Sequence, residues 1–234
     1  MKNLIAGNWK MNPVSQKEAE DIFNAVKSGT ENTTAEVIIC PPNIYLPILS
    51  GLTLGAQNIY FEEKGAFTGE VSAAMLKDLG VEYVIIGHSE RRKYFGETDE
   101  LINKKIKKAL EYGLKVIFCV GETAEERDAG KKNEVLERQL KIGLTEIDNL
   151  ENINIAYEPV WAIGTGNNCG IEETKESINF IREFVRSDTR IIYGGSVKSE
   201  NSGAYIKEAG ANGLLPGGAS LIPEEFIKIV ESAE

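Results

Sequence analysis

Lys10, His88 and Glu158 each lie at the end of a short, mostly apolar run of the sequence. A cation, an imidazole and a carboxylate can together attract an anionic substrate, polarise a carbonyl group and move a proton. Each residue also has an ordinary explanation: a solvated lysine, a structural histidine or a structural carboxylate. We favour chemistry because all three are predicted at the ends of strands, where one rim would collect them.

Two glycine pairs follow the last two apolar runs. They are Gly194-Gly195 and Gly217-Gly218. Glycine lets backbone N–H groups approach an anion closely, and a short helix after the second pair would add its N-terminal dipole. Either pair alone is equally typical of a tight turn between a strand and a helix. Both pairs together, on the final two strands, predict a phosphate site.

The segment 159–166 joins an apolar run to the next helix and combines bulky side chains with glycines. It contains Trp161 and Ile163 as well as Gly164 and Gly166. This composition is typical of a loop that closes over a site, excludes water and offers an N–H to a phosphate. Alternatively, the two bulky side chains pack permanently on neighbouring helices.

Short apolar runs alternate with amphipathic stretches of roughly 10–15 residues along the whole chain. Helix starts are indicated by Ser15 with Glu18, by Thr98, by Thr123 and by Pro223. The predicted strands are Leu4–Asn8, Val37–Cys40, Thr53–Gln57, Tyr83–Gly87, Val116–Val120, Ile153–Tyr157, Arg190–Tyr193 and Gly213–Leu215. Eight such units predict an α/β fold, a (β/α)8 TIM barrel formed by residues 1–234 as a single domain. The alternative is a doubly wound sheet. Such a sheet typically has a glycine-rich GxGxxG turn after its first strand, and the sequence has none there.

Composition limits the partners and the compartment. The chain has 26 basic and 36 acidic side chains, a formal charge of −10, so nucleic acid is not an expected partner. The three cysteines are far apart and lack CxxC spacing, which argues against a disulfide framework or a zinc site. The sequence shows neither a signal peptide nor an apolar run of about 18 residues. We therefore expect a cytoplasmic protein that does not bind membranes.

Seven segments together form a more specific pattern. They are Asn8–Asn12, Gly65–Glu70, Ile86–Arg92, Cys119–Glu122, Tyr157–Gly166, Tyr193–Val197 and Gly217–Leu221. In these segments the chain resembles the triosephosphate isomerase family, from residue 3 to about residue 230. The motifs GHSERR and YEPVWAIGTG are highly specific in this order. The resemblance implies interconversion of dihydroxyacetone phosphate and D-glyceraldehyde 3-phosphate, in glycolysis and gluconeogenesis, without metal or cofactor.

The resemblance also implies a role for each matching residue. Glu158 is the expected base, and His88 is the neutral imidazole that polarises the substrate oxygens. Lys10 supplies positive charge, Asn8 helps to orient the substrate, and Glu90 supports Lys10. Without the resemblance, Glu90 is equally explained by a surface ion network with the basic residues that follow it.

Further matching positions surround the expected catalytic groups. Those expected to bind phosphate are Gly164, Ser196, Gly217 and Gly218, so the phosphate contacts are mostly neutral backbone groups. Ile163 and Leu215 match apolar residues that, in the family, pack against the base and keep water away from it.

The long segment 58–70 is expected to mediate assembly. By resemblance, its tip at Thr68 inserts beside Lys10 of a second copy and forms a homodimer. The alternative is a solvent-exposed Ω-loop, although Phe67 would then be an unfavourable surface residue.

Two departures from the family pattern concern the same rim. Pro216 stands where the family usually has valine, and it removes an N–H beside the phosphate glycines, so we expect a shifted rim and weakened activity. The competing view is that the proline fits the loop and stabilises it. Residues 167–170 also differ from the usual end of the closing loop, which affects its kinetics more than the chemistry.

Two other functions compete with the isomerase. One is another phosphosugar isomerase or lyase on the same fold, such as an indole-pathway or ribulose-type barrel, which would not explain GHSERR. The other is a catalytically impaired barrel that binds a phosphorylated metabolite, with Pro216 disturbing the site. The presence of Lys10, His88 and Glu158 argues against the second alternative.

Overall fold

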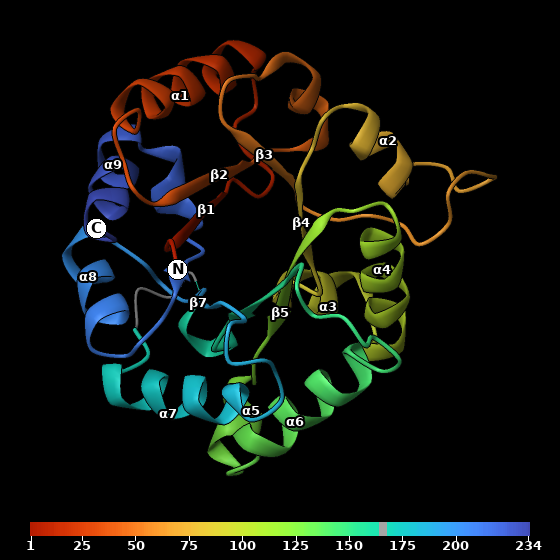
Figure 1. Ribbon diagram of the computed structural model, residues 1–234, viewed down its shortest axis with the longest axis vertical. Coiled ribbons are helices and arrows are strands. Elements are labelled where there is room, and N and C mark those ends of the chain that lie inside the picture. Colours follow the sequence, from red (N-terminus) through yellow and green to blue (C-terminus); the bar gives the residue numbers. More distant parts are fainter. Residues whose placement is uncertain (164–167) are drawn as a thin grey trace.

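The computed structural model describes residues 1–163 and 168–234. Within these residues, eight parallel strands close into a barrel in their order along the chain, and helices form a ring around them (Figure 1). The strands are β1 (Leu4–Asn8), β2 (Glu36–Cys40), β3 (Thr53–Ala56), β4 (Tyr83–Ile86), β5 (Lys115–Val120), β6 (Ile153–Tyr157), β7 (Ile191–Tyr193) and β8 (Gly213–Leu214). The TIM barrel prediction is confirmed, and each strand boundary lies within one residue of its predicted position.

The helices begin where the sequence signals predict. Ser15 accepts a hydrogen bond from the Glu18 N–H, Thr123 forms a full capping box with Glu126, and Pro223 occupies the first turn of its helix. The helices are α1 (Gln16–Gly29), α2 (Ala73–Asp78), α3 (Ser89–Phe95), α4 (Asp99–Glu111), α5 (Ala124–Asp128), α6 (Lys132–Gly143), α7 (Ile171–Arg182), α8 (Ser199–Lys207) and α9 (Pro223–Glu231), with 3₁₀ turns η1 (Asn43–Ile48), η2 (Val160–Ala162) and η3 (Gly218–Leu221).

Apolar side chains fill both faces of the barrel wall. Leu4 and Ala6 of β1 belong to a small cluster in the barrel interior, whereas Ile5 packs in the larger layer between strands and helices. This alternation follows from the pleat of a strand. Because both faces are buried, the strands are nearly continuous apolar runs in the sequence.

A polar network closes the amino-terminal end of the barrel. Arg190 Nη1 lies 2.5 Å from Glu36 Oε2, and Arg190 Nε donates to Asn154 Oδ1 at 2.8 Å. The Tyr83 hydroxyl donates to Glu36 and accepts from Arg190 Nη2. These contacts join the starts of four strands or the residues beside them. The candidate site residues lie at the opposite end of the barrel.

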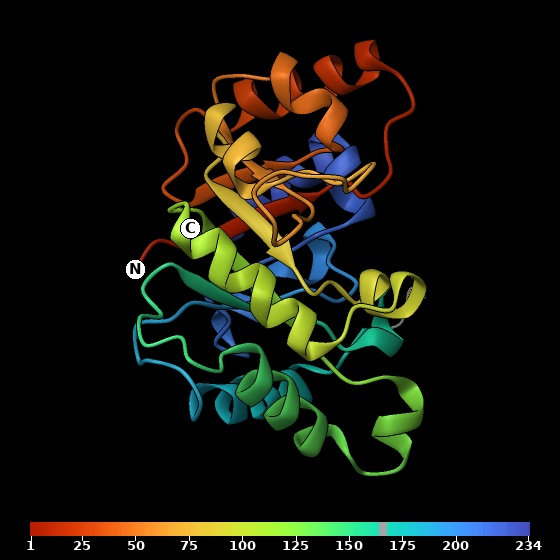
Figure 2. The ribbon, with the colours of Figure 1, turned by 90° about the vertical axis from the view of Figure 1, so that its right-hand side faces the viewer.

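The carboxyl ends of the strands lie at that opposite end. In Figure 2 the β4 arrow points towards the short helix α3, and the N-terminus lies on the other side of the barrel. Among the residues described, none of the helices is long and apolar enough to span a membrane.

Candidate active site

Polar side chains from three strands meet at the carboxyl end of the barrel. Asn8 ends β1 and Lys10 follows it, while His88 follows β4 and Glu158 follows β6. His88 Nε2 lies 3.1 Å from Glu158 Oε1, and Lys10 Nζ lies 2.5 Å from Glu90 Oε1. The fold thus brings together residues that are far apart in the sequence.

The proton on His88 is assigned by its neighbours. His88 caps α3, and its Nδ1 accepts a hydrogen bond from the Glu90 N–H at 3.2 Å. An accepting ring nitrogen has no proton, so a neutral imidazole has its proton on Nε2. That nitrogen faces Glu158. The side chain can therefore donate a hydrogen bond into the site without being charged.

The Glu158 carboxylate is almost fully buried, at 2% exposure. Its Oε2 accepts from the Ser89 N–H at 3.0 Å. Its Oε1 lies 3.1 Å from His88 Nε2, but among the described residues this oxygen has no hydrogen bond. Gly194 makes room for the side chain, since a Cβ there would lie 2.9 Å from Glu158 Cγ. The result is a buried carboxylate with one oxygen that lacks a hydrogen bond among the described residues, a feature that calls for an explanation.

The backbone of Lys10 adopts a left-handed conformation with φ of 55°, which is uncommon for a residue with a side chain. Two contacts hold it there. The Lys10 N–H donates to Asn8 Oδ1 at 3.1 Å, and Gln57 Nε2 donates to the Lys10 carbonyl and to that of Cys40, each at 2.8 Å. We did not single out Gln57 from the sequence, although it ends the third predicted strand, where site residues were expected.

A cavity of about 540 Å³ lies beside these groups. It is lined by Asn8, Lys10, His88, Ile163, Gly194, Gly195, Ser196, Val197, Lys198, Glu200, Leu215, Gly217, Gly218, Ala219, Ile222 and Glu225. The two glycine pairs thus lie on the same wall, and η3 begins at Gly218 as predicted. Gly164 lies outside the described residues.

Asn201 holds the loop that follows β7, a contact that the sequence analysis missed. Its Nδ2 donates to the Ser196 carbonyl at 3.1 Å, and its Oδ1 accepts from the Lys198 N–H at 2.9 Å. The Ser196 hydroxyl in turn donates to the Ala162 carbonyl at 2.6 Å. The β7 loop is therefore tied both to α8 and to the segment after β6.

Trp161 is held from two sides. Its Nε1 donates to Glu122 Oε1 at 2.8 Å, and the Arg127 guanidinium lies 4.0 Å from the centre of its ring. Burial raises the pKa of the Glu122 carboxyl, and hydrogen bonds from Trp161 and Tyr157 oppose that rise. In this structure Trp161 packs against its neighbours, while Ile163 lies in the cavity wall.

Comparison with known proteins decides the family. A family model described as triosephosphate isomerase matches residues 3–233. The chain belongs to the triosephosphate isomerase family. A triosephosphate isomerase from Alkaliphilus oremlandii (strain OhILAs) is 48% identical over 246 residues, which cover 98% of each chain. Another from Aquifex aeolicus (strain VF5) is 48% identical over 247 residues, 99% of this chain and 100% of the relative.

Pro216 departs from the usual triosephosphate isomerase pattern, and the structure shows how it is accommodated. The Leu215 N–H donates to the Tyr193 carbonyl at 2.8 Å, and the Pro216 carbonyl accepts from the Asn8 N–H at 2.9 Å. Leu215 remains 3% exposed and lines the cavity. These bonds favour the view that the proline fits the loop over the expectation of a shifted rim.

We therefore expect the Pro216→Val variant to keep kcat/KM within about twofold of the parent and to melt about 1–4 °C lower. The physical reason is that valine gives the unfolded chain more conformational freedom. Steady-state kinetics and a thermal melt on both proteins measure these effects. A several-fold gain in kcat/KM would instead support the shifted rim that the sequence suggested.

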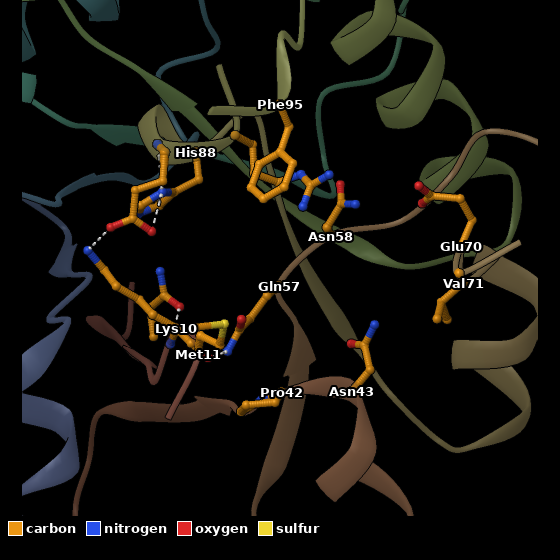
Figure 3. Close-up of a pocket in the computed structure, with 14 residues that line it drawn as sticks. Lys10, Met11, Pro42, Asn43, Gln57, Asn58, Glu70, Val71, His88 and Phe95 are labelled. Carbon is orange, nitrogen blue, oxygen red and sulfur yellow. Dashed lines mark hydrogen bonds and ion pairs between the residues drawn. The ribbon is translucent and has the colours of Figure 1, made fainter. Parts of the chain in front are cut away.

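A second hollow, of about 470 Å³, adjoins the first. Figure 3 shows Lys10, Met11 and His88 on one side of it and Glu70 and Val71 on the other. Met11 is 90% exposed at its edge.

The long loop 58–70 lines the second hollow with its two ends, at Asn58 and at Gly69 and Glu70. It projects beyond α2 and α4 (Figure 1), and Thr68 near its tip is exposed. Phe67 is 40% exposed, and its ring lies 4.7 Å from that of Tyr60. The tip therefore points away from the body of its own chain.

Proposed function

We propose that this chain interconverts dihydroxyacetone phosphate and glyceraldehyde 3-phosphate by proton transfer through an enediolate, with Glu158 as the base. One observation supports this most strongly: His88 Nε2 lies 3.1 Å from Glu158 Oε1 beside a cavity that also contains both glycine pairs. Membership of the triosephosphate isomerase family gives the substrate class.

The reaction requires a carbon-bound proton to move between adjacent carbons. Glu158 takes the proton from one carbon and returns it to the next. The Nε2–H of His88 hydrogen-bonds to the substrate oxygens, gives its proton to the carbonyl oxygen as that oxygen becomes negative, and recovers a proton from the neighbouring hydroxyl, which becomes the new carbonyl. The carboxylate is buried and held by the Ser89 N–H. It must therefore turn away from Ser89 to reach a substrate in the cavity.

Phosphate binding would fix the other end of the substrate. The N–H groups of Ser196, Gly217 and Gly218 are the proposed donors. The Lys10 side chain lies against Gly217: if Gly217 carried a Cβ, that atom would be 3.7 Å from Lys10 Nζ. Its ion pair with Glu90 keeps the ammonium in one place. We assign phosphate contact to Gly164 by family resemblance alone.

Three side chains complete the proposed site. Asn8 is 5% exposed and lies in both cavities, where its amide can orient the substrate. Ile163 and Leu215 line the cavity as apolar groups. Excluding water from the carboxylate strengthens its attraction for a proton, which is the role we propose for these two residues.

We propose that a second copy of this chain inserts its Thr68 loop into the hollow beside Lys10. The loop projects from the molecule, and the hollow is rimmed by exposed apolar groups, including Met11 at 90% and Phe95 at 66% exposure. Exposed apolar surface of this kind is unfavourable in a monomer. A homodimer with two equivalent loop insertions would cover it.

We also propose a cytoplasmic location for this enzyme. Cys40, Cys119 and Cys169 are free and buried, a state typical of a reducing compartment.

A coupled assay tests the function directly. Purified protein, treated with chelator and supplied with no cofactor of its own, should convert glyceraldehyde 3-phosphate to dihydroxyacetone phosphate, measured through a reductase that consumes the product. Turnover supports the proposal. Binding of phosphoglycolate without turnover would point instead to the impaired barrel considered above.

A further inference from the structure

An exposed lysine lies at the phosphate end of the proposed active site. Lys198 follows the β7 loop, caps α8 and lines the same cavity as Gly217 and Gly218. Its backbone position is fixed, because its N–H donates to Asn201 Oδ1 at 2.9 Å. The fold therefore fixes the point from which this side chain extends.

The two lysines that line this cavity differ in their ion pairs. Lys10, the other lysine in the wall, is neutralised by Glu90 at 2.5 Å. No ion pair of 4.0 Å or less joins Lys198 to any acid among the residues described. Of the two described lysines that line this cavity, Lys198 is thus the one without an ion pair to a carboxylate.

Two acids share the same wall. Glu200 is exposed, and Glu225 accepts hydrogen bonds from the N–H and the hydroxyl of Ser199, at 2.7 and 3.0 Å. The whole chain has a formal charge of −10. A phosphate dianion therefore approaches a protein whose overall field repels it, through a mouth that contains two further negative charges.

We propose that Lys198 is a positioning residue that draws the phosphate dianion into the site through its field, without bonding to the bound phosphate. The proposal rests on the isomerase function proposed above. Neutral N–H groups make the close contacts, and those dipoles act only at short range. The field of a single charge extends further, because the screening length in solution is about 30 Å at 0.01 M salt and about 3 Å at 1 M. The positive charge of Lys198 then offsets the repulsion between the phosphate and the carboxylates of Glu200 and Glu225.

The test compares Lys198→Ala with the parent at two ionic strengths. At about 0.01 M we expect kcat/KM for glyceraldehyde 3-phosphate to fall roughly threefold to tenfold, with kcat unchanged, whereas at about 0.5 M the two proteins should converge. Lys198→Arg should keep the parental value. Lys207→Ala is the matched control, because it removes an exposed lysine from the far end of the same helix.

Three outcomes would overturn the proposal. An equal loss at both ionic strengths would indicate direct contact with phosphate, and an unchanged kcat/KM at low salt would remove the role altogether. An equal loss in Lys207→Ala would show only an effect of net charge. Failure of the isomerase function is distinguishable, because the parent itself would then show no turnover.

A second variant tests the sign of the effect. Glu200→Gln removes a negative charge from the same wall and should raise kcat/KM at low ionic strength, by a factor that disappears at high salt. A decrease would contradict the field that we propose.

Discussion

Replacing Glu158 by aspartate is expected to lower kcat about a hundredfold or more. The shorter side chain retracts the carboxylate by roughly one methylene, and a displacement of about 1 Å from the reacting carbon can slow a reaction by about this factor. Little in the surroundings can follow the shorter side chain. Ser89 holds one oxygen through its N–H at 3.0 Å, and Gly194 packs against the Glu158 methylene groups. KM should change much less than kcat, since the carboxylate bonds to the reacting carbon's proton and not to the phosphate.

Steady-state kinetics in both directions measure this effect. Glu36→Asp is the matched control: it makes the same change in a partly buried glutamate at the closed end of the barrel, where the ion pair with Arg190 lies. That variant should lose thermal stability and keep its kcat. Near-parental kcat in the Glu158→Asp protein would show that another group is the base.

Replacing Thr68 by glutamate is expected to shift the proposed homodimer towards monomer, since burying an unpaired charge at an interface costs several kcal/mol. Activity should then fall about tenfold or more at nanomolar protein concentrations. In the proposed dimer the new carboxylate would enter the partner's hollow beside Glu70 and Glu90, which both line it. Like charges would then face one another. The loss of activity would follow from exposing Lys10 and the residues near it.

Sedimentation velocity and activity, both measured as a function of protein concentration, test this expectation. Thr34→Glu is the control, because Thr34 is exposed and lies just before β2, at the opposite end of the barrel. Activity of the Thr68 variant should recover at high concentration if dissociation is its cause. An unchanged oligomer with full activity would rule out this interface.

Where the strands begin and end could be predicted because the physics is local. Both faces of a barrel strand are buried, so each strand is a short apolar run, as in Ile153–Tyr157. Helix starts such as Ser15 and Thr123 were also predictable, because a cap bonds to an N–H three residues away. The sequence likewise placed Lys10, His88 and Glu158 after strands, and the order of parallel strands then gathers them at one rim.

Tertiary structure decided how those groups are held, because the contacts join residues that are distant in the sequence. Gln57 stabilises the left-handed backbone of Lys10 from another strand, and the Ser89 N–H holds Glu158 from 69 residues away. No periodicity or cap signal encodes either contact. Pro216 shows the same limit: its ring and missing N–H predicted a disturbed rim, whereas the bonds of Leu215 and Pro216 to neighbouring strands, which favour a proline that fits, depend on the fold. The sequence by itself determined the barrel and its family and indicated the candidate reactive groups. The fold alone determined the separations, burial and partners of those groups, since these depend on which strands become neighbours when the sheet closes.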